Sequence, residues 1–262
     1  MKKIVWSWKI LISLLLLGGV IIASAGIPRW LHLGKPPVVN KTPAAATPVF
    51  GKKEEGLVRQ LIAVTAHMES CPEMFISGTF NIKDPSDGTA DTRQPFRLCR
   101  KGNALYYQNG DMETVALEDV YINISKDAQK MIVGPTRKIV SPFQFPSDTV
   151  VQFWKSEGYT ISGETHAEVS TIRMLRENHV SCKEYRYDYD SSAMVMKRIY
   201  MRLTNLRDPL NSSMDKEMTI MIDQWKEKDI PTSLLRRNTY LVKKADGWEP
   251  AGEYTGYTVV SL

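Results

Sequence analysis

Strict alternation of apolar and charged side chains from residue 183 to residue 190 constrains the fold of this chain more than any other feature. Tyr185, Tyr187 and Tyr189 alternate there with acidic and basic residues. A period of two puts successive side chains on opposite faces of an extended strand, so the segment predicts a strand with one apolar face. Its charged face is expected to lie in water. Three other segments alternate in the same way: residues 74–83, 194–204 and 217–225.

Short strands separated by turn residues are predicted between residues 96 and 133. Five are expected: 96–100, 104–108, 114–117, 120–124 and 130–133. Connections such as Lys101-Gly102-Asn103 and Asn109-Gly110-Asp111 are so short that neighbouring strands must run antiparallel. Because each strand offers one apolar face, the economical arrangement is a single long antiparallel sheet with helices packed against that face.

Two helices are predicted. In residues 54–69, Leu57, Leu61, Val64 and Met68 recur at helical spacing, and the helix is expected to end before Pro72. A second helix is expected to begin at the capping sequence of residues 146–148 and to end near residue 158, where a glycine follows. The fold class predicted from these elements is therefore α+β.

The N-terminus has the pattern of an export signal. Lys2, Lys3 and Lys9 precede an uncharged run over residues 10–27. A lysine excess before such a run places the N-terminus in the cytoplasm and the rest of the chain across the inner membrane. Two fates remain open for residues 1–27. They are a signal peptide cleaved after Ala25, or a signal anchor held by flanking tryptophans and an arginine, which lie at positions 6, 8, 29 and 30.

The rest of the chain divides into a linker and one domain. Residues 28–53 are rich in proline and lack apolar periodicity, which is typical of an extended spacer. Residues 54–262 show no second compositional break and are predicted to form one α+β domain. At its end, residues 240–243 and 254–260 suggest an added hairpin, and residues 258–262 are apolar enough to pair with a sheet edge.

Charge argues against a nucleic-acid partner. The net charge is +5, from 34 basic and 29 acidic residues. Three of the basic residues belong to the N-terminal segment, which leaves 31 basic against 29 acidic residues, well mixed along the domain. A nucleic-acid-binding protein would need a concentrated basic stripe.

No catalytic, metal-binding or cofactor-binding motif is found. The four histidines are scattered, and no phosphate-binding or dinucleotide-binding loop occurs. The Ser213–Lys216 pair has the spacing used by some acyl-transferring enzymes but lacks their other motifs. We therefore expect a protein that is not an enzyme and that has no metal and no cofactor.

Three cysteines are too few for a disulfide framework. Cys71 and Cys99 are the closest pair in sequence and are the candidates for one disulfide, whereas the alternative is three unpaired thiols including Cys182.

The order of elements resembles a known family. An opening amphipathic helix is followed by a strand with Gly78-Thr79-Phe80, a meander with Phe96-Arg97 and residues 104–107, a helix, and then long strands. Residues 196–201, 218–225 and 230–235 resemble the last two strands and the following turn of the periplasmic lipoprotein-carrier (LolA/LolB-like) family. The resemblance covers about residues 54–242.

The resemblance implies a curved, unclosed half-barrel whose concave apolar face is covered by helices and holds acyl chains. It also implies the bacterial periplasm as the location. The unbranched thioether side chains of methionine suit a variable apolar ligand. The candidate cavity residues are Phe80, Phe96, Tyr106, Trp154, Met174, Met194, Met196, Met201, Met218, Ile220 and Trp225.

Two functional hypotheses follow. The first is a periplasmic carrier or receptor domain that binds a lipid or an acylated protein and is tethered to the inner membrane through residues 10–27. The alternative is a bitopic structural component of a cell-envelope assembly or secretion complex. Such a component would bind an envelope protein rather than lipid, and its own side chains would fill the cavity.

Overall fold

The computed structural model describes residues 51–85, 92–137, 154 and 156–262. The predicted N-terminal membrane segment and almost all of the predicted linker lie outside these ranges. Within the described residues, no helix is both long and apolar enough to cross a membrane.

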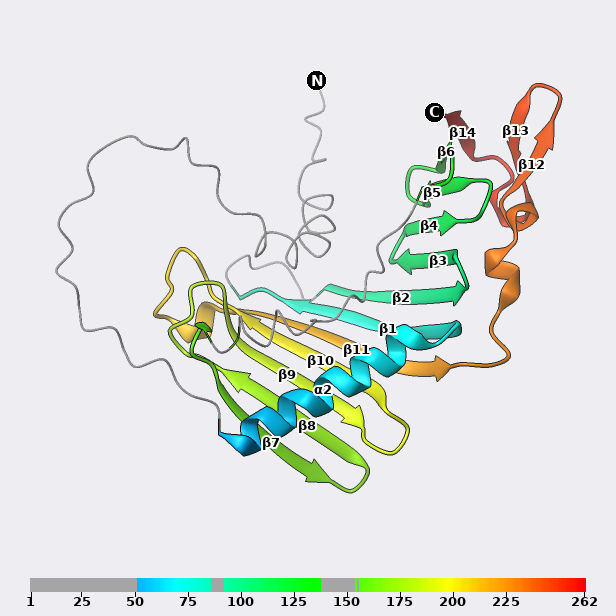
Figure 1. The fold of residues 1–262 in the computed structure, drawn as a ribbon. Coiled ribbons are helices and arrows are strands. Elements are labelled where there is room, and N and C mark those ends of the chain that lie inside the picture. Colours follow the sequence, from blue (N-terminus) through cyan, green and yellow to red (C-terminus); the bar gives the residue numbers. More distant parts are fainter. Residues whose placement is uncertain (1–50, 86–91, 138–153, 155) are drawn as a thin grey trace, which may run out of the picture. The chain divides into compact units, whose positions relative to one another are not determined.

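Twelve strands form one sheet, which is curved and does not close on itself (Figure 1). Its strands are β1 (Glu73–Lys83), β2 (Thr92–Lys101), β3 (Ala104–Asn109), β4 (Met112–Ala116), β5 (Tyr121–Ser125), β6 (Lys130–Gly134), β7 (Thr160–His166), β8 (Val169–Leu175), β9 (Cys182–Asp190), β10 (Val195–Leu203), β11 (Lys216–Lys226) and β14 (Thr258–Ser261). The order across the sheet is β14-β6-β5-β4-β3-β2-β1-β11-β10-β9-β8-β7. The predicted antiparallel sheet is confirmed, with one parallel pair, β14 with β6, among these strands.

Strand β1 joins the two halves of the sheet. It pairs with β2 on one side and with β11 on the other, so the meander β1–β6 and the meander β7–β11 meet there. Gly78 is required at this junction. A Cβ atom at this position would lie 1.8 Å from the Met221 carbonyl oxygen, because the β1–β11 register shifts between Ser77 and Gly78.

The first predicted helix is present as α2 (Lys52–Ser70), which begins two residues earlier than expected. Its buried side chains include Val58, Leu61, Val64 and Met68, in agreement with helical spacing. The Arg100 guanidinium, from β2, donates hydrogen bonds to the carbonyl groups of Glu69 and Cys71 at 2.9 and 2.6 Å. A basic side chain therefore satisfies the free carbonyls at the C-terminal end of the helix.

The second predicted helix lies mainly outside the described residues. Trp154 and Ser156 are helical, and Gly158 has a φ of 74°, as expected for a glycine that ends a helix.

The sheet buries apolar side chains on both of its faces. Gly163, Ile172 and Tyr187 share the face that α2 covers, called the helix face here, since Leu57 of α2 lies against Gly163. Cys99 and Tyr106 pair on the opposite face, the back face. A second core lies there, formed by Cys99, Tyr106, Val115, Ile122, Ile124, Met131, Val133, Ile230, Tyr240, Leu241 and Tyr254, with others. Residues that follow β11 thus cover the back face of β2–β6.

The C-terminal segment corrects one prediction. Strand β12 (Leu241–Lys244) forms its hairpin with β13 (Gly247–Pro250), not with residues 254–260. Residues 258–261 instead form β14, which pairs with β6, so the predicted pairing of the last residues with a sheet edge is confirmed. The expected partner was wrong because residues 245–246 already form a tight turn. Gly247, with a φ of 132°, begins β13 directly after that turn.

Candidate ligand-binding face

Two rows of side chains run across the helix face at right angles to the strands. The first row passes from β7 to β1 through Gly163, Ile172, Tyr187, Ile199, Ile220 and Phe80. The second row passes through Ile161, Met174, Tyr185, Met201, Met218 and Ile82. Directly paired residues have side chains on the same face of a sheet. Six strands at the usual spacing make each row about 24 Å long. We call these residues the apolar rows.

Helix α2 runs across the helix face from β7 toward the end of β11 (Figure 1). Leu57 lies against Gly163 on β7, and the Tyr189 hydroxyl on β9 donates a hydrogen bond of 3.0 Å to the Gln60 side-chain oxygen. Farther along, His67 pairs with Glu227, just past the end of β11. Tyr185, in the second row, is four residues from Tyr189, which is about 13 Å along a strand. The Gln60 contact therefore lies about 13 Å from Tyr185 along β9.

Aromatic side chains from the segment before β7 cover part of the second row. The Trp154 ring centre lies 6.3 Å from that of Tyr185 and 6.4 Å from that of Tyr187. Tyr159 lies 5.8 Å from Tyr185, and its hydroxyl donates a hydrogen bond to the Cys182 carbonyl oxygen. Burial raises the pKa of both Tyr159 and Tyr185, so these phenols stay neutral and contribute apolar surface.

The rows are unevenly buried. Met174 and Ile172 are fully buried on β8, whereas Met201, Ile220 and Ile82 are only partly buried toward β10, β11 and β1. Phe80 and Met218, which lie among these three side chains, are each 7% exposed, so the accessible part of the apolar rows on β10, β11 and β1 consists of Met201, Ile220 and Ile82.

The structure places nine of the eleven sequence-derived cavity candidates on or over the helix face. Met174, Met201, Met218, Ile220 and Phe80 belong to the apolar rows. The other four are close to the rows: Phe96, which pairs with Gly78; Met196, which pairs with Tyr189; Trp225, which pairs with Ile76; and Trp154.

The remaining two candidates lie elsewhere. Tyr106 is on the back face, where its hydroxyl donates a hydrogen bond of 3.0 Å to Glu113. Met194 is in the turn between β9 and β10 with a φ of 55°. Strand alternation could have separated Tyr106 from Tyr107, but which of these two neighbours faces the helix depends on the register of the whole sheet.

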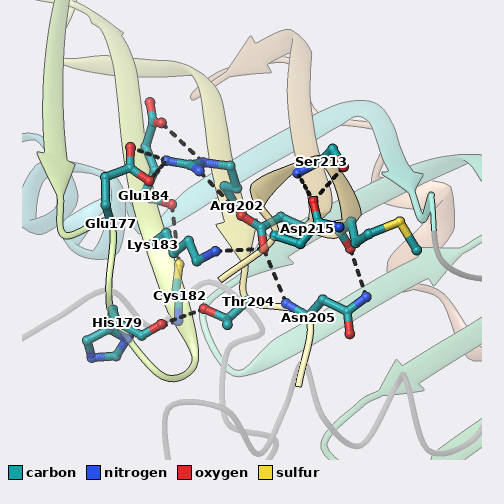
Figure 2. Close-up of polar contacts among 12 residues, drawn as sticks. Glu177, His179, Cys182, Lys183, Glu184, Arg202, Thr204, Asn205, Ser213 and Asp215 are labelled. Atoms are coloured by element: carbon teal, nitrogen blue, oxygen red, sulfur yellow. Dashed lines mark hydrogen bonds and ion pairs between the residues drawn. The ribbon is translucent and has the colours of Figure 1, made fainter. Parts of the chain in front are cut away.

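An ionic cluster binds together the strands under the second row (Figure 2). Lys183 Nζ lies 3.0 Å from Asp215 Oδ1, and Arg202 lies 3.3 Å from the other oxygen of Asp215. Arg202 also pairs with Glu177 at 2.8 Å and with Glu184 at 3.6 Å. The cluster connects β9, the end of β10 and the residue before β11, so it fixes the strands that carry Tyr185, Met201 and Met218.

The charged face of β9 was predicted to be solvated, and this was wrong for Glu184 and Asp188. Glu184 is only 4% exposed and Asp188 only 8%. Burial by itself would raise the pKa of Glu184, but hydrogen bonds from Arg173 and Arg186 and their charges outweigh it and lower the pKa. Cross-strand arginines on β8 and β10 cover these carboxylates, which the sequence of β9 alone does not reveal.

The Ser213–Lys216 pair does not form a catalytic arrangement in the structure. Ser213 is exposed and its hydroxyl donates a hydrogen bond of 2.6 Å to Asn211, whereas Lys216 pairs with Asp84 at 2.7 Å.

The three cysteines are free and buried, so the alternative of a Cys71–Cys99 disulfide is not formed. Cys99 points to the back face, whereas Cys71 follows α2 on the other side of the sheet. Burial raises the pKa of both Cys99 and Cys182 to about 11.

The fold brings together three groups that the sequence analysis did not connect. A ring nitrogen of His67, Cys71 Sγ and a carboxylate oxygen of Glu227 lie within 4.8 Å of one another. The spacing of four residues from His67 to Cys71, at the end of the predicted helix, was the one signal available in the sequence.

Comparisons with known proteins give similar structures but no sequence relatives. No protein-family model matches the chain, and no curated protein is similar in sequence. One similar structure is an uncharacterized conserved protein from Thermus thermophilus, with 9% identity and a TM-score of 0.41 over 79% of this chain and 99% of that chain. A DUF1329 family protein from Desulfovibrio piger has 8% identity and a TM-score of 0.31 over 70% and 97%.

A LolA superfamily protein from Nitrosomonas europaea is also among the similar structures. It has 8% identity and a TM-score of 0.24, over 69% of this chain and 97% of that chain. The superfamily named for this structure is the one that residues 54–242 resemble in sequence, and the similarity has low identity and a low TM-score.

Proposed function

We propose that this chain is a non-enzymatic periplasmic carrier or receptor domain that holds a lipid, or the acyl chains of a lipidated protein, against the apolar rows. The observation that carries the proposal is the continuity of these rows over six strands together with the partial exposure of Met201, Ile220 and Ile82. Burial of apolar surface supplies about 25 cal/mol per Å², and an acyl chain needs no hydrogen-bonding partners.

The composition of the rows suits such a ligand. Met201 and Met218 are adjacent across β10 and β11, and Met174 lies in the same row. Thioether side chains are flexible and polarisable, so they can pack against chains of different length. The ionic cluster around Asp215 would keep the underlying strands rigid while side chains above them adjust.

The sequence of residues 1–53 supports a tethered form of this function. An apolar run after three lysines, followed by a proline-rich linker, would hold the domain at the outer surface of the inner membrane. N-terminal sequencing of the exported protein tests this part: a new start at Gly26 would refute the anchor and favour a freely diffusing carrier.

Lipid binding is tested with the purified full chain and two matched variants. Ile220 and Met221 are neighbours on β11, and both are partly buried, but they lie on opposite faces. We expect Ile220→Glu to weaken binding of a fluorescent fatty acid at least about tenfold, or 1.4 kcal/mol, and Met221→Glu to change it far less. Met201→Glu repeats the test from β10. Thermal unfolding checks that each variant is folded.

Lipid extraction and native mass spectrometry of the full chain complete the test. Acyl species that co-purify with the wild type and are lost from Ile220→Glu support the proposal. A wild-type chain that carries no lipid and does not bind the fluorescent fatty acid contradicts it.

A protein-binding role in an envelope assembly is the second candidate. The observation that favours it is the complete burial of Met174 and Met196, since side chains of the chain itself already fill that part of the helix face. In that case neither lipid nor fatty acid would bind, and Ile220→Glu would affect only the capture of a protein partner by cross-linking in the intact envelope.

A further inference from the structure

The structure assigns a metal site to His67, Cys71 and Glu227, and we propose that it binds one zinc ion that joins the end of α2 to the end of β11. The proposal is independent of lipid binding. It rests on the convergence of three different donor atoms, from two elements far apart in the sequence, to within 4.8 Å of one another.

Two of the donors come from the end of the helix. His67 is in the last turn of α2, and Cys71 follows directly after it. A spacing of four residues places both side chains on one side of a helix, one turn apart. The Arg100 guanidinium donates a hydrogen bond of 2.6 Å to the Cys71 carbonyl oxygen, so the backbone that carries the thiol is fixed to β2.

The third donor comes from the strand side. Glu227 follows β11 directly, and its Oε1 lies 3.0 Å from His67 Nε2. Trp225 Nε1 donates a hydrogen bond of 2.9 Å to the same oxygen. Hydrogen bonds of this kind orient a ligating carboxylate, as groups in the outer sphere of metal sites commonly do. The carboxylate is thus already aimed at the helix before any ion binds.

The chemistry of the donors favours zinc. Thiolate, imidazole and carboxylate are the ligands that Zn²⁺ takes in proteins, at about 2.3 Å for sulfur and 2.0–2.2 Å for nitrogen and oxygen. In a tetrahedral site these lengths place the ligand atoms about 3.3–3.8 Å apart, so a movement of about 1 Å by flexible side chains closes the site. On binding, the Cys71 thiol proton, which now forms a hydrogen bond of 3.3 Å to the His67 carbonyl oxygen, is released to solvent.

A fourth position would remain open to water. Cys71 is buried, but the His67 and Glu227 side chains are 37% and 40% exposed. An ion can therefore enter from solvent, and water can complete the coordination. The consequence for the fold is a bond between α2 and the sheet at the end of the helix opposite Leu57.

The test uses the metal-free full chain, titrated with zinc chloride in a calorimeter and with Co²⁺ in a spectrophotometer. We expect one Zn²⁺ per chain, a higher melting temperature with Zn²⁺, and a thiolate-to-cobalt charge-transfer band. Trp225→Phe removes a group outside the coordination sphere. Such changes cost 10–100-fold, so this variant should weaken zinc binding by about tenfold. Cys71→Ser, His67→Gln and Glu227→Gln each remove a ligand and should weaken zinc binding by about 100-fold. Cys71→Ser should also abolish the charge-transfer band.

The matched control is His166→Gln. His166 lies 3.5 Å from Glu164 on β7, an exposed histidine–glutamate pair, so loss of this histidine should leave zinc affinity unchanged. Glu227 is exposed, and Glu227→Gln therefore provides a variant that keeps the fold. Absence of saturable zinc binding, survival of the cobalt band in Cys71→Ser, or equal affinity of Glu227→Gln and the wild type would each overturn the proposal.

Discussion

Lys183 Nζ lies 3.0 Å from Asp215 Oδ1, and the two side chains are only 2% and 1% exposed. Asp215 has further partners, since Arg202 and the backbone NH of Asn205 each donate a hydrogen bond of 3.3 Å to it (Figure 2). Within the described residues, the ion-pair partner of Lys183 is Asp215 alone. Removal of Asp215 therefore leaves Lys183 without an ion-pair partner, whereas removal of Lys183 leaves Asp215 with two hydrogen-bond donors.

Asp215→Ala should destabilise the protein more than Lys183→Met. Loss of the carboxylate leaves the buried ammonium without a counter-charge, which costs about 3–5 kcal/mol. Loss of the ammonium leaves Asp215 with Arg202 and Asn205, and the expected cost is about half as large or less. Urea unfolding at neutral pH measures both free energies. Equal losses would mean that the buried lysine is not held by this pair.

Gly78→Ala should disrupt the junction between β1 and β11. The added Cβ would lie 1.8 Å from the Met221 carbonyl oxygen, which belongs to the backbone and cannot rotate away. We expect a loss of about 3 kcal/mol or more, at the upper end of overpacking effects. The control is Gly56→Ala in α2, where nothing lies within 4 Å of the added atom. This control should gain about 0.5–1 kcal/mol, because alanine favours a helix over glycine. Thermal unfolding of both variants distinguishes the two effects.

Glu184 should make stability dependent on acid pH. Its pKa is lowered from the ordinary value of 4.5 because arginine partners outweigh burial. A carboxyl with a lowered folded-state pKa stabilises the protein above its unfolded-state pKa, and this contribution is lost as the pH falls through the folded-state value. The difference in unfolding free energy between the wild type and Glu184→Gln should therefore be largest near pH 7 and should shrink below about pH 4.5.

The exposed Glu164 provides the comparison for that experiment. Its side chain is 66% exposed, so Glu164→Gln should follow the wild-type stability curve closely. A constant difference between the wild type and Glu184→Gln from pH 7 to pH 3 would contradict the role given to the arginine partners.

Tyr254 should hold the C-terminal segment on the back face. Its hydroxyl donates a hydrogen bond of 2.5 Å to Glu113, which is 2% exposed and also pairs with Lys126 at 2.7 Å. Tyr254→Phe should cost about 1.5–3 kcal/mol, since the hydrogen bond is to a charged group. Tyr257→Phe is the matched control, because no hydrogen bond of its hydroxyl is found within the described residues, and it should be nearly neutral. Hydrogen exchange of β14 amides reports whether the segment has loosened.

Cys99 and Cys182 should resist alkylation in the folded protein. Both thiols are buried, and burial raises the pKa of each to about 11, so little thiolate is present at pH 8. In denaturant without reductant, all three cysteines should react, since all are free. A pair that stays unreactive until reductant is added would reveal a disulfide and contradict the structure.

Regular alternation predicted the strands well where one face is apolar throughout. The tyrosine strand at residues 183–190 and the partner at 194–204 are present as β9 and β10 within two residues. Strand β7 was not predicted individually, because Ile161 is the one large apolar side chain in its sequence, as befits an edge strand. The burial of Glu184 was missed because its cover comes from Arg173 and Arg186, and Arg173 belongs to another strand.

The local elements and their order follow from the amino-acid sequence, because side-chain period and turn residues act between near neighbours in the chain. The tertiary structure shows in addition that residues 230–257 return to cover the back face of β2–β6, which no local pattern indicates. It also brings together groups that are far apart in the sequence, such as Glu227 with His67 and Cys71. Contacts of this kind depend on strand register, because a shift of one residue would turn every side chain of a strand to the opposite face of the sheet.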